Sequence, residues 1–261
     1  MKKKEVAGNA ERIVFPFPSG ELLSKGLESL GFPEDDGLYR TVGMHGRKTI
    51  NLLVRKYLKE LELFNAVFDL VGAETGTEQG RSDLVVRHIL DSIAPWKEIA
   101  SLIASGGDRA ESGQVFEIAD AGSGAGFPGI PLAIIFPDVH FTLVERMSKR
   151  CAFLENSKAI LGLKIVSVLN SEVENAPARF FDIVVFRAFR PLDREMTQIL
   201  LRMLKADPEG MILGRLAAWK ARKDKIDVEM SMITDVVKSF DCIRLDVPFL
   251  AHEERHLVII P

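Results

Sequence analysis

The chain has 261 residues, of which 47% are hydrophobic and 27% are charged, and its formal net charge is −3 at pH 7. This length allows one large domain or two modest ones, and the apolar fraction is sufficient for a buried core. The slightly negative charge excludes a positive field over the whole molecule, so any nucleic acid must be bound by local basic patches.

Proline and glycine punctuate residues 1 to about 35 and separate short apolar pieces that follow no clear period. We therefore expect a flexible start. No signal-type apolar core follows Met1–Glu5, and no run in the chain approaches the roughly 18–20 apolar residues that span a bilayer. The sequence predicts a cytoplasmic protein without a membrane partner.

Two helices are predicted in the first part of the chain. Between Thr49 and Val71, apolar residues recur at helical spacing with charged residues between them, which indicates an amphipathic helix. A polar, glycine-rich break over residues 72–80 separates it from a second helix, which Ser82 can cap and which extends to about Ile93.

The stretch over residues 105–113 has the composition of a linker. It predicts a boundary at about residue 112, between a small N-terminal helical region (1–112) and an α/β domain (113–261). Past that boundary, predicted strands and helices alternate, which favours a mostly parallel sheet.

Seven strands are predicted for this sheet. They are expected at residues 115–119, 141–145, 165–169, 183–186, 211–213, 243–247 and 256–260. Helices are expected after Pro128 and at residues 148–161, 192–204 and about 217–240. The last two strands are close enough in sequence to form a hairpin, so we expect an antiparallel terminal strand beside the parallel ones.

One stretch carries most of the functional information: an apolar run that ends in Asp120 and continues with Gly122, Gly124 and Gly126. Glycine allows positive φ angles and lets the backbone approach a ligand closely, which a side chain would prevent. Dinucleotide sites prefer the spacing G-x-G-x-x-G, whereas this chain has G-x-G-x-G followed by Phe127. The pattern acid-x-Gly-x-Gly-x-Gly resembles instead the loop of S-adenosylmethionine (SAM) methyltransferases.

A second acid, Glu145, ends the next predicted strand about twenty residues after the loop, where many nucleotide sites bind ribose hydroxyls. NAD sites and SAM sites share this feature, so it indicates an adenosine ribose without defining the chemistry. The plainer alternative is a tight strand-to-helix turn followed by a surface acid. An NAD-dependent dehydrogenase is disfavoured by the glycine spacing and by the lack of an obvious catalytic Tyr-Lys pair.

Four segments, taken together and in order, resemble the RsmG (GidB) family of 16S ribosomal RNA guanine-N7 methyltransferases. They are Val86–Ser92, Asp120–Pro131, Lys149–Leu154 and Arg187–Phe189. The resemblance implies an α/β fold of the class I SAM-dependent methyltransferase type, which is Rossmann-like, with SAM as the cofactor. It also implies methyl transfer to N7 of a guanine in the decoding-region loop of 16S ribosomal RNA.

The resemblance also implies which residues bind. SAM is expected to contact Asp120, Gly122, Gly124, Gly126, Phe127, Glu145, Val173, Glu174 and Arg187. Basic residues around the pocket are expected to hold RNA phosphates without specifying sequence. They are Arg146, Lys149, Arg150, Arg190 and Arg215.

The chemistry requires few catalytic groups. Methyl transfer from a sulfonium is an in-line displacement, and guanine N7 already holds an in-plane lone pair, so positioning suffices and no general base is needed. Arg187 is a candidate to hydrogen-bond guanine O6 or a phosphate. His88 is a candidate to line the pocket, although a lone helical histidine is more often structural. Phe127 and Phe189 are candidates either to flank the base or to pack in the core.

One departure from the family keeps other acceptors open. The lysine-glycine pair that usually follows the fifth strand is not found around Leu213–Arg215, so Arg215 is the candidate to supply the lysine's charge. A SAM-dependent methyltransferase or SAM-binding protein with a different acceptor is therefore the main alternative. The two cysteines make neither a disulfide framework nor a zinc site, so we expect no metal. We also expect a monomer.

Overall fold

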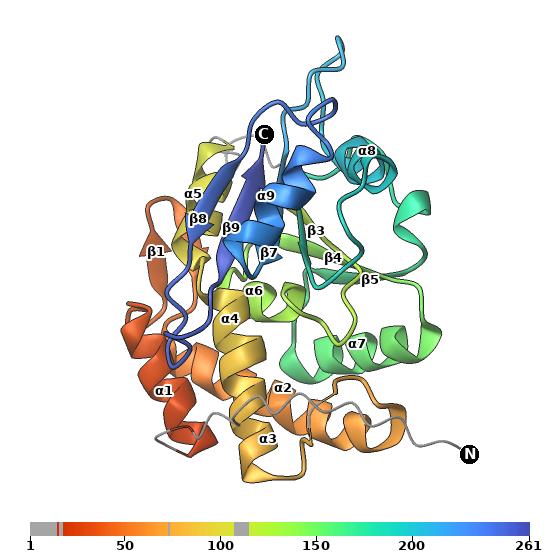
Figure 1. The fold of residues 1–261 in the computed structure, drawn as a ribbon. Coiled ribbons are helices and arrows are strands. Elements are labelled where there is room, and N and C mark those ends of the chain that lie inside the picture. The colour runs from red at the N-terminus through yellow and green to blue at the C-terminus, as the bar shows by residue number, and fades with distance from the viewer. Residues whose placement is uncertain (1–14, 16–17, 73, 107–114) are drawn as a thin grey trace, which may run out of the picture.

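The structure is a computed structural model that describes residues 15, 18–72, 74–106 and 115–261. A seven-stranded sheet lies at its centre, with helices packed against both faces (Figure 1). The strands are β3 (Glu117–Ala121), β4 (His140–Glu145), β5 (Val166–Asn170), β6 (Ile183–Arg187), β7 (Arg215–Lys220), β8 (Asp241–Arg244) and β9 (His256–Ile260). Their order across the sheet is β5-β4-β3-β6-β7-β9-β8.

Strand β9 runs antiparallel to both of its neighbours, β7 and β8, while the other paired strands are parallel. This arrangement confirms the predicted Rossmann-like sheet with an antiparallel terminal strand, and it confirms the C-terminal hairpin. The chain leaves β3 toward β4 and β5 on one side and later returns to place β6 on the other side. Open α/β sheets bind ligands beyond the carboxyl ends of the strands at such a switch point.

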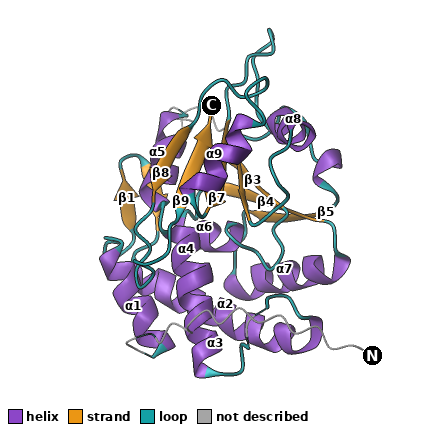
Figure 2. Cartoon of the chain, viewed as in Figure 1, coloured by secondary structure: helices purple, strands orange, loops and turns teal. Residues whose placement is uncertain are grey.

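The helices surround this sheet. They are α1 (Ser19–Ser29), α2 (Arg47–Phe68), α3 (Glu78–Asp83), the π-helix η1 (Leu84–Leu90), α4 (Asp91–Ile93), α5 (Trp96–Ser105), α6 (Gly129–Ile135), α7 (Ser148–Leu161), the 3₁₀ turn η2 (Val173–Asn175), α8 (Arg194–Met203) and α9 (Lys223–Ser231). A separate hairpin consists of β1 (Gly37–Tyr39) and β2 (Val42–Met44). Helices α1 to α4 gather below the sheet in the view of Figure 2.

Each face of the sheet has its own hydrophobic core, because successive strand residues point to opposite faces. On β7, Ala217 and Trp219 join the core that includes side chains of α2, α5, α6 and α7. Leu216 and Ala218 join the core that includes side chains of α8 and α9. Burial on both sides is the reason that these strands have nearly continuous apolar sequences.

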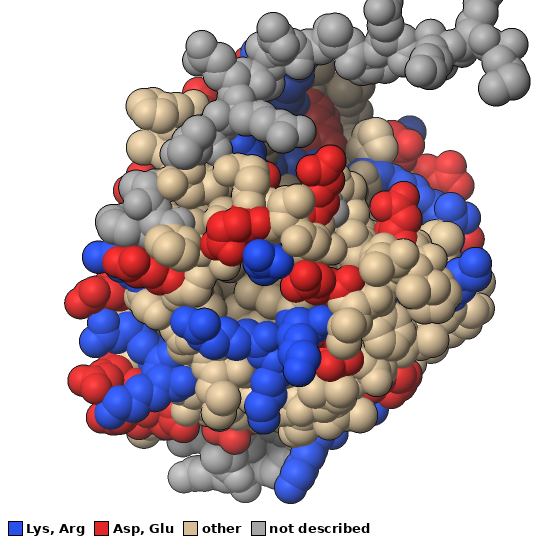
Figure 3. Space-filling model, turned by 90° about the horizontal axis from the view of Figure 1, so that it is seen from below, with Lys and Arg blue, Asp and Glu red and all other residues tan. Residues whose placement is uncertain are grey.

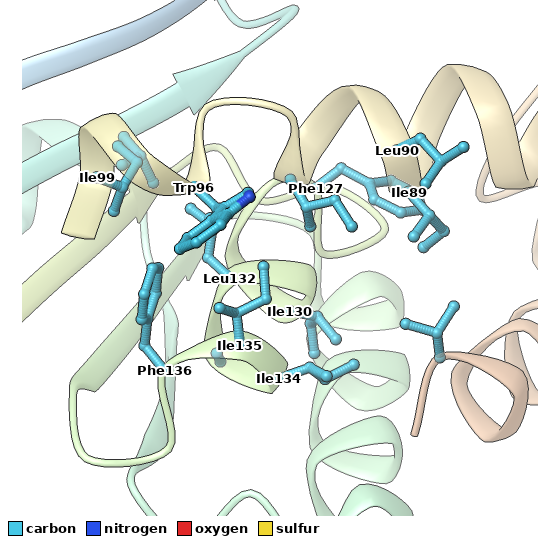
Figure 4. Close-up of a cluster of buried hydrophobic side chains, with 14 of the residues drawn as sticks. Ile89, Leu90, Trp96, Ile99, Phe127, Ile130, Leu132, Ile134, Ile135 and Phe136 are labelled. Atoms are coloured by element: carbon cyan, nitrogen blue, oxygen red, sulfur yellow. The ribbon is translucent and has the colours of Figure 1, made fainter. Parts of the chain in front are cut away.

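The N-terminal helices share a core with the sheet. Trp96 of α5 and Phe136, which caps the end of α6, lie in one buried cluster (Figure 4). The indole Nε1 of Trp96 also donates a hydrogen bond to the carbonyl of Leu30 at 2.9 Å. The predicted domain boundary at residue 112 lies outside the described residues, so the division at that residue stays a prediction.

Two predictions for the N-terminal region are wrong. Helix α1 begins at Ser19, within the segment predicted to be flexible, because three leucines at helical spacing face the core. The second helix is capped by Thr77, whose side-chain oxygen accepts the N–H of Gly80 at 3.0 Å. Ser82, the predicted cap, is buried within α3.

The prediction for residues 211–240 is also wrong. Residues 211–213 form no strand of the sheet, and Asp207 holds their turn by accepting the N–H of Met211 at 2.7 Å. The fifth parallel strand is β7 (Arg215–Lys220), and α9 is much shorter than the predicted helix. Alanine favours helices in isolation, but the run from Leu216 to Trp219 is buried between two layers of helices and forms a strand.

Replacing Phe136 with alanine removes a fully buried ring from the core that the N-terminal helices and the sheet share. We expect the free energy of unfolding to fall by about 3–5 kcal/mol, because the substitution loses the favourable burial of the ring and leaves a cavity in the core. Leu52→Ala is the control, since its side chain on α2 is 56% exposed. Chemical denaturation measures both, and an equal effect of the two substitutions would contradict the shared core.

Candidate functional site

Two adjoining cavities lie beyond the carboxyl ends of the central strands. The first has a volume of about 240 Å³ and is lined by Gly122, Val144, Glu145, Arg146, Arg150, Ser171, Glu172, Val173, Ala188, Phe189 and Arg190. The second has a volume of about 570 Å³ and is lined by Arg87, His88, Asp91, Phe186, Arg187, Ala188, Phe189, Arg190, Pro191, Trp219, Lys220, Ala221, Glu229 and Arg255. The segment 188–190, which follows β6, belongs to both, so ligands in the two cavities would lie side by side.

The glycine loop follows β3 and meets the first cavity at Gly122. Its φ angle is +73°, and a Cβ atom at this position would lie 2.3 Å from the ring of Phe189. Gly126 has a φ angle of +95°, and a Cβ atom there would lie 2.9 Å from the hydroxyl of Tyr57, which donates to the carbonyl of Ala125. The absence of a side chain at Gly122 therefore leaves room for the ring of Phe189. At Gly126 it leaves room for Tyr57 of α2, which holds the loop by its hydrogen bond to Ala125.

Asp120 lies beneath the loop and lines neither cavity. It is fully buried, and its Oδ2 atom accepts the N–H of Gly129 at 3.0 Å, at the start of α6. Burial raises the pKa of Asp120 from 3.8 to about 7. The structure thus gives this residue a role in joining β3 to α6.

Glu145, at the end of β4, is the carboxylate of the first cavity. Its Oε2 atom accepts the N–H of Gly124 at 2.9 Å, and its Oε1 atom accepts the N–H of Met147 at 2.8 Å. Val173 lines the same cavity, but its neighbour Glu174 does not. Of the two predicted residues beside the adenine, only the valine therefore has access to a ligand there.

Arg187, at the end of β6, is held by three groups from one N-terminal segment. Its Nη1 atom donates to the carbonyl of Arg87 at 2.9 Å and to Oδ2 of Asp91 at 2.8 Å. Its Nη2 atom lies 3.0 Å from Nδ1 of His88. Because a guanidinium only donates, Nδ1 accepts and the imidazole proton is on Nε2. Burial, reinforced by Arg187 and Arg87, lowers the pKa of His88 to about 3, so the ring is neutral.

Asp91 lies between two arginines. Besides its bond to Arg187, its Oδ1 atom lies 3.3 Å from Nε of Arg255, and its side chain is 6% exposed. Its backbone carbonyl accepts the indole N–H of Trp219 at 3.1 Å. Arg87 pairs with Asp83 at 3.2 Å and with Glu253, which precedes β9, at 2.6 Å.

Of the two phenylalanine candidates, Phe127 packs behind the site and Phe189 lies at it. Phe127 is buried, with the guanidinium carbon of Arg187 5.2 Å from its ring centre and the ring of His88 at 5.0 Å. Phe127 lines neither cavity, so it supports these two side chains. Phe189 lines both cavities and is half-buried at their junction.

Three of the five predicted RNA-binding residues line the cavities, and Lys149 lies on α7 without lining either of them. Arg146 and Arg150 line the first cavity, and Arg190 lines both while pairing with Glu172 at 3.0 Å and with Glu174. Lys149 lies on the same helix α7, 5.9 Å from the ring of Phe68 at the end of α2. The first cavity thus has a basic rim whose charges are partly balanced by acids.

Arg215 does not belong to this group. It is the first residue of β7, at the amino end of the strand, whereas the cavities lie beyond the carboxyl ends. Its guanidinium donates to the carbonyls of Leu213 and Gly214. The residue that ends β7 is Lys220, which lines the second cavity. The lysine expected after the fifth strand is therefore present at this position, and Ala221 follows it instead of glycine. The shift arose because the strand was predicted several residues too early.

Sequence reasoning assigned no role to Trp219, Glu229 and Arg255 of the second cavity, and it placed Lys220 in a predicted helix instead of at the end of a strand. A correct end for β7 identifies Trp219 and Lys220. Arg255 carries a weaker signal, since it directly precedes the last strand. No local pattern distinguishes Glu229 from other charged residues of α9.

Two further properties bear on the ligands. In the described ranges, no group of three or more histidine, cysteine, aspartate or glutamate side chains is arranged to hold a metal ion. Among the helices that the structure describes, none combines the length and the apolar character that crossing a membrane requires.

The variant Asp120→Asn isolates the titration of the buried carboxyl group. Between 3.8 and about 7 the folded protein holds a proton that the unfolded chain has lost, so this stabilisation is present at low pH and disappears as the pH rises through about 7. Asparagine still accepts the N–H of Gly129 but does not titrate. Between about pH 5 and pH 8 we expect the free energy of unfolding of the wild type to fall by about 2–3 kcal/mol more than that of the variant. Urea denaturation at both values tests this, and parallel pH profiles would refute it.

Comparison with known proteins places the chain in a family. The family model for GidB, rRNA small subunit methyltransferase G, matches residues 50–258. A ribosomal RNA small subunit methyltransferase G of Treponema denticola is 38% identical over 93% of this chain and 94% of that protein. The protein of the same name from Treponema pallidum is 37% identical over 80% of this chain and 83% of that protein. A solved structure of a putative S-adenosyl-L-methionine-dependent methyltransferase from Methanococcus maripaludis aligns with a TM-score of 0.45 and 16% identity, over 66% of this chain and 89% of that one. The chain belongs to the rRNA small subunit methyltransferase G (GidB) family.

Proposed function

We propose that this protein transfers the methyl group of SAM to N7 of a guanine in 16S ribosomal RNA. The observation that carries this proposal is the junction of the two cavities at Phe189, beside the glycine loop on one side and Arg187 on the other. Relatives named as ribosomal RNA small subunit methyltransferases support an RNA substrate. Membership of their family leaves the dehydrogenase alternative without support.

The first cavity has the chemistry that the adenosine part of SAM requires. Each oxygen of Glu145 accepts one backbone N–H and has a further lone pair for a ribose hydroxyl. Val173 offers an apolar surface to the adenine, and the missing side chain at Gly122 lets a ligand approach the backbone. SAM supplies a methyl group on a positively charged sulfur. Asp120, Gly124, Gly126, Phe127 and Glu174 do not line this cavity, so we assign them to the support of the loop and its surroundings.

The second cavity has the chemistry that positions a guanine. Three bonds to Arg87, His88 and Asp91 fix the guanidinium of Arg187, and a guanidinium has five N–H donors in all. We assign one of the remaining donors to guanine O6, which is adjacent to N7. N7 attacks through its lone pair and no proton has to leave it, so the neutral His88 acts as an acceptor that orients Arg187 and not as a base.

RNA phosphates have a basic rim available on the first cavity. Arg146 has a side chain that is 64% exposed, and Arg150 and Lys149 follow it on α7. Arg190 is half-exposed at the junction of the two cavities. We assign these four residues to phosphate contacts, which fix the position of the RNA without reading its sequence.

A second basic surface lies on the face that α2 and α3 present. Figure 3 shows Lys and Arg side chains gathered beside a hollow on this face. A cavity of about 230 Å³ between α1, α2 and α3 has Arg55, Lys59 and Arg81 at its edge and Leu58 and Leu84 among its apolar residues. We assign this surface to flanking RNA. With the rRNA as its partner, the protein is proposed to act in the cytoplasm as a monomer.

Methyl transfer is tested with small ribosomal subunits that lack the modification. The purified protein is incubated with labelled SAM and these subunits, and the RNA is then digested to nucleosides. We expect a 7-methylguanosine product, reduced about 100-fold or more in Arg187→Lys, because lysine cannot make the three fixed bonds of the guanidinium. Arg244→Lys, an exposed arginine on β8, is the matched control. Label in another nucleoside would identify a different acceptor and refute the proposal.

The position of SAM is tested with a pair of glycine variants. Gly122 and Gly162 have similar φ angles of +73° and +69°, but a Cβ atom at Gly122 meets Phe189 at 2.3 Å, whereas nothing lies within 4 Å of one at Gly162. We expect Gly122→Ala to raise the SAM Kd at least tenfold, because the displaced ring and the new methyl group occupy the first cavity. Gly162→Ala carries the same backbone strain and should leave the Kd within about twofold. Calorimetry measures both, and equal Kd values would place SAM elsewhere.

A further inference from the structure

The second cavity holds an ion pair for which the mechanism above has no use. Glu229 of α9 and Lys220 at the end of β7 both line this cavity. The ammonium group lies 2.8 Å from Oε1 and 2.7 Å from Oε2 of the glutamate. Oε1 also accepts the N–H of Leu192 at 2.6 Å. The side chain of Glu229 is 17% exposed and that of Lys220 is 19% exposed, so the pair is fixed in position but accessible from the cavity.

Guanine has a donor edge that an N7 methyltransferase must place somewhere. N7 and O6 accept hydrogen bonds, whereas N1–H and the 2-amino group donate them. When N7 points to the methyl group in the first cavity, the donor edge lies on the far side of O6 and points into the second cavity. A carboxylate oxygen with a free lone pair is a strong acceptor for such a donor.

The side chains that line the second cavity offer few free acceptors. Asp91 is enclosed between Arg187 and Arg255 and is only 6% exposed. Nδ1 of His88 already accepts from Arg187. The remaining acidic side chain among the described residues of this cavity is Glu229, whose Oε2 atom has Lys220 as its bonded partner and keeps a lone pair.

We propose that Glu229 recognises the target base through Oε2, whose remaining lone pair accepts a hydrogen bond from the 2-amino group of guanine, with Lys220 as the positioning residue. This inference rests on the proposed function and adds the group that selects guanine. In the transfer, the bond between sulfur and methyl breaks as the bond between N7 and methyl forms. The positive charge thereby passes from sulfur to the base, the thioether leaves neutral, and no proton moves. A carboxylate at the donor edge stabilises that developing charge.

The test combines a change in the enzyme with a change in the substrate. Small ribosomal subunits are reconstituted with RNA that carries guanosine or inosine at the methylated position, because inosine lacks only the 2-amino group. For the wild type we expect kcat/KM to be about 10- to 100-fold higher with guanosine, since a charge-assisted hydrogen bond is lost with inosine. In Glu229→Gln we expect this preference to shrink to a few-fold. The control is Glu195→Gln, an exposed glutamate in the first turn of α8, which should keep the preference.

The outcomes separate the inference from the proposed function. If Glu229→Gln lowers kcat/KM equally for both RNAs, the residue only supports the fold through Leu192 and Lys220, and the inference is overturned while the proposed function stands. If the wild type methylates neither RNA, the proposed function fails and the inference falls with it. The SAM Kd of Glu229→Gln, measured in parallel, should equal that of the wild type. A loss of SAM binding would show a general defect and would also overturn the specific role.

Discussion

The site depends on one buried interaction, the attachment of the Arg187 guanidinium to the N-terminal segment that contains Arg87, His88 and Asp91. A charge out of water must be paired, because leaving one partner unpaired costs about 3–5 kcal/mol. The end of β6 and the N-terminal helices are therefore fixed relative to each other. Asp91 also contacts two further strands. Its backbone carbonyl accepts the indole N–H of Trp219 near the end of β7, and its carboxylate lies 3.3 Å from Arg255, which precedes β9. One helical residue thus gathers the ends of three strands around the second cavity.

The charges of the second cavity are balanced in pairs, and this balance suits a reaction in which a positive charge is transferred to the substrate. Arg187 is paired with Asp91, and Lys220 with Glu229. The neutral form of His88 avoids adding another cation beside them. Since N7 needs no base, the work of the protein is to hold the acceptor in line and exclude water. The shared wall between the cavities brings the donor and acceptor of the methyl group together.

Predictions made from strand ends succeeded because parallel strands bring their carboxyl ends to one edge of the sheet, whatever the details of packing. Gly122 follows β3 and Glu145 ends β4, and both line the first cavity. Spacing does not show on which side of a loop a side chain lies, so Asp120 was assigned to the cofactor although it is buried against α6. Lys220 was placed in a helix and not at a strand end, because an alanine-rich run is compatible with a helix and the fifth strand was predicted too early. Glu229 became recognisable only through tertiary packing, which brings α9 against the end of β7.

The attachment of Arg187 depends in turn on an irregular helix. Segment Leu84–Leu90 is a π-helix, and the N–H of Asp91 donates to the carbonyl of Val86, five residues earlier. In an α-helix this N–H would bond to the carbonyl of Arg87, four residues earlier. The carbonyl of Arg87 instead accepts from Arg187. π-helical turns are found often at functional sites, and here the wider turn has a definable use. It directs a backbone carbonyl, an imidazole and a carboxylate from five consecutive residues to one guanidinium, which regular α-helical hydrogen bonding would not allow.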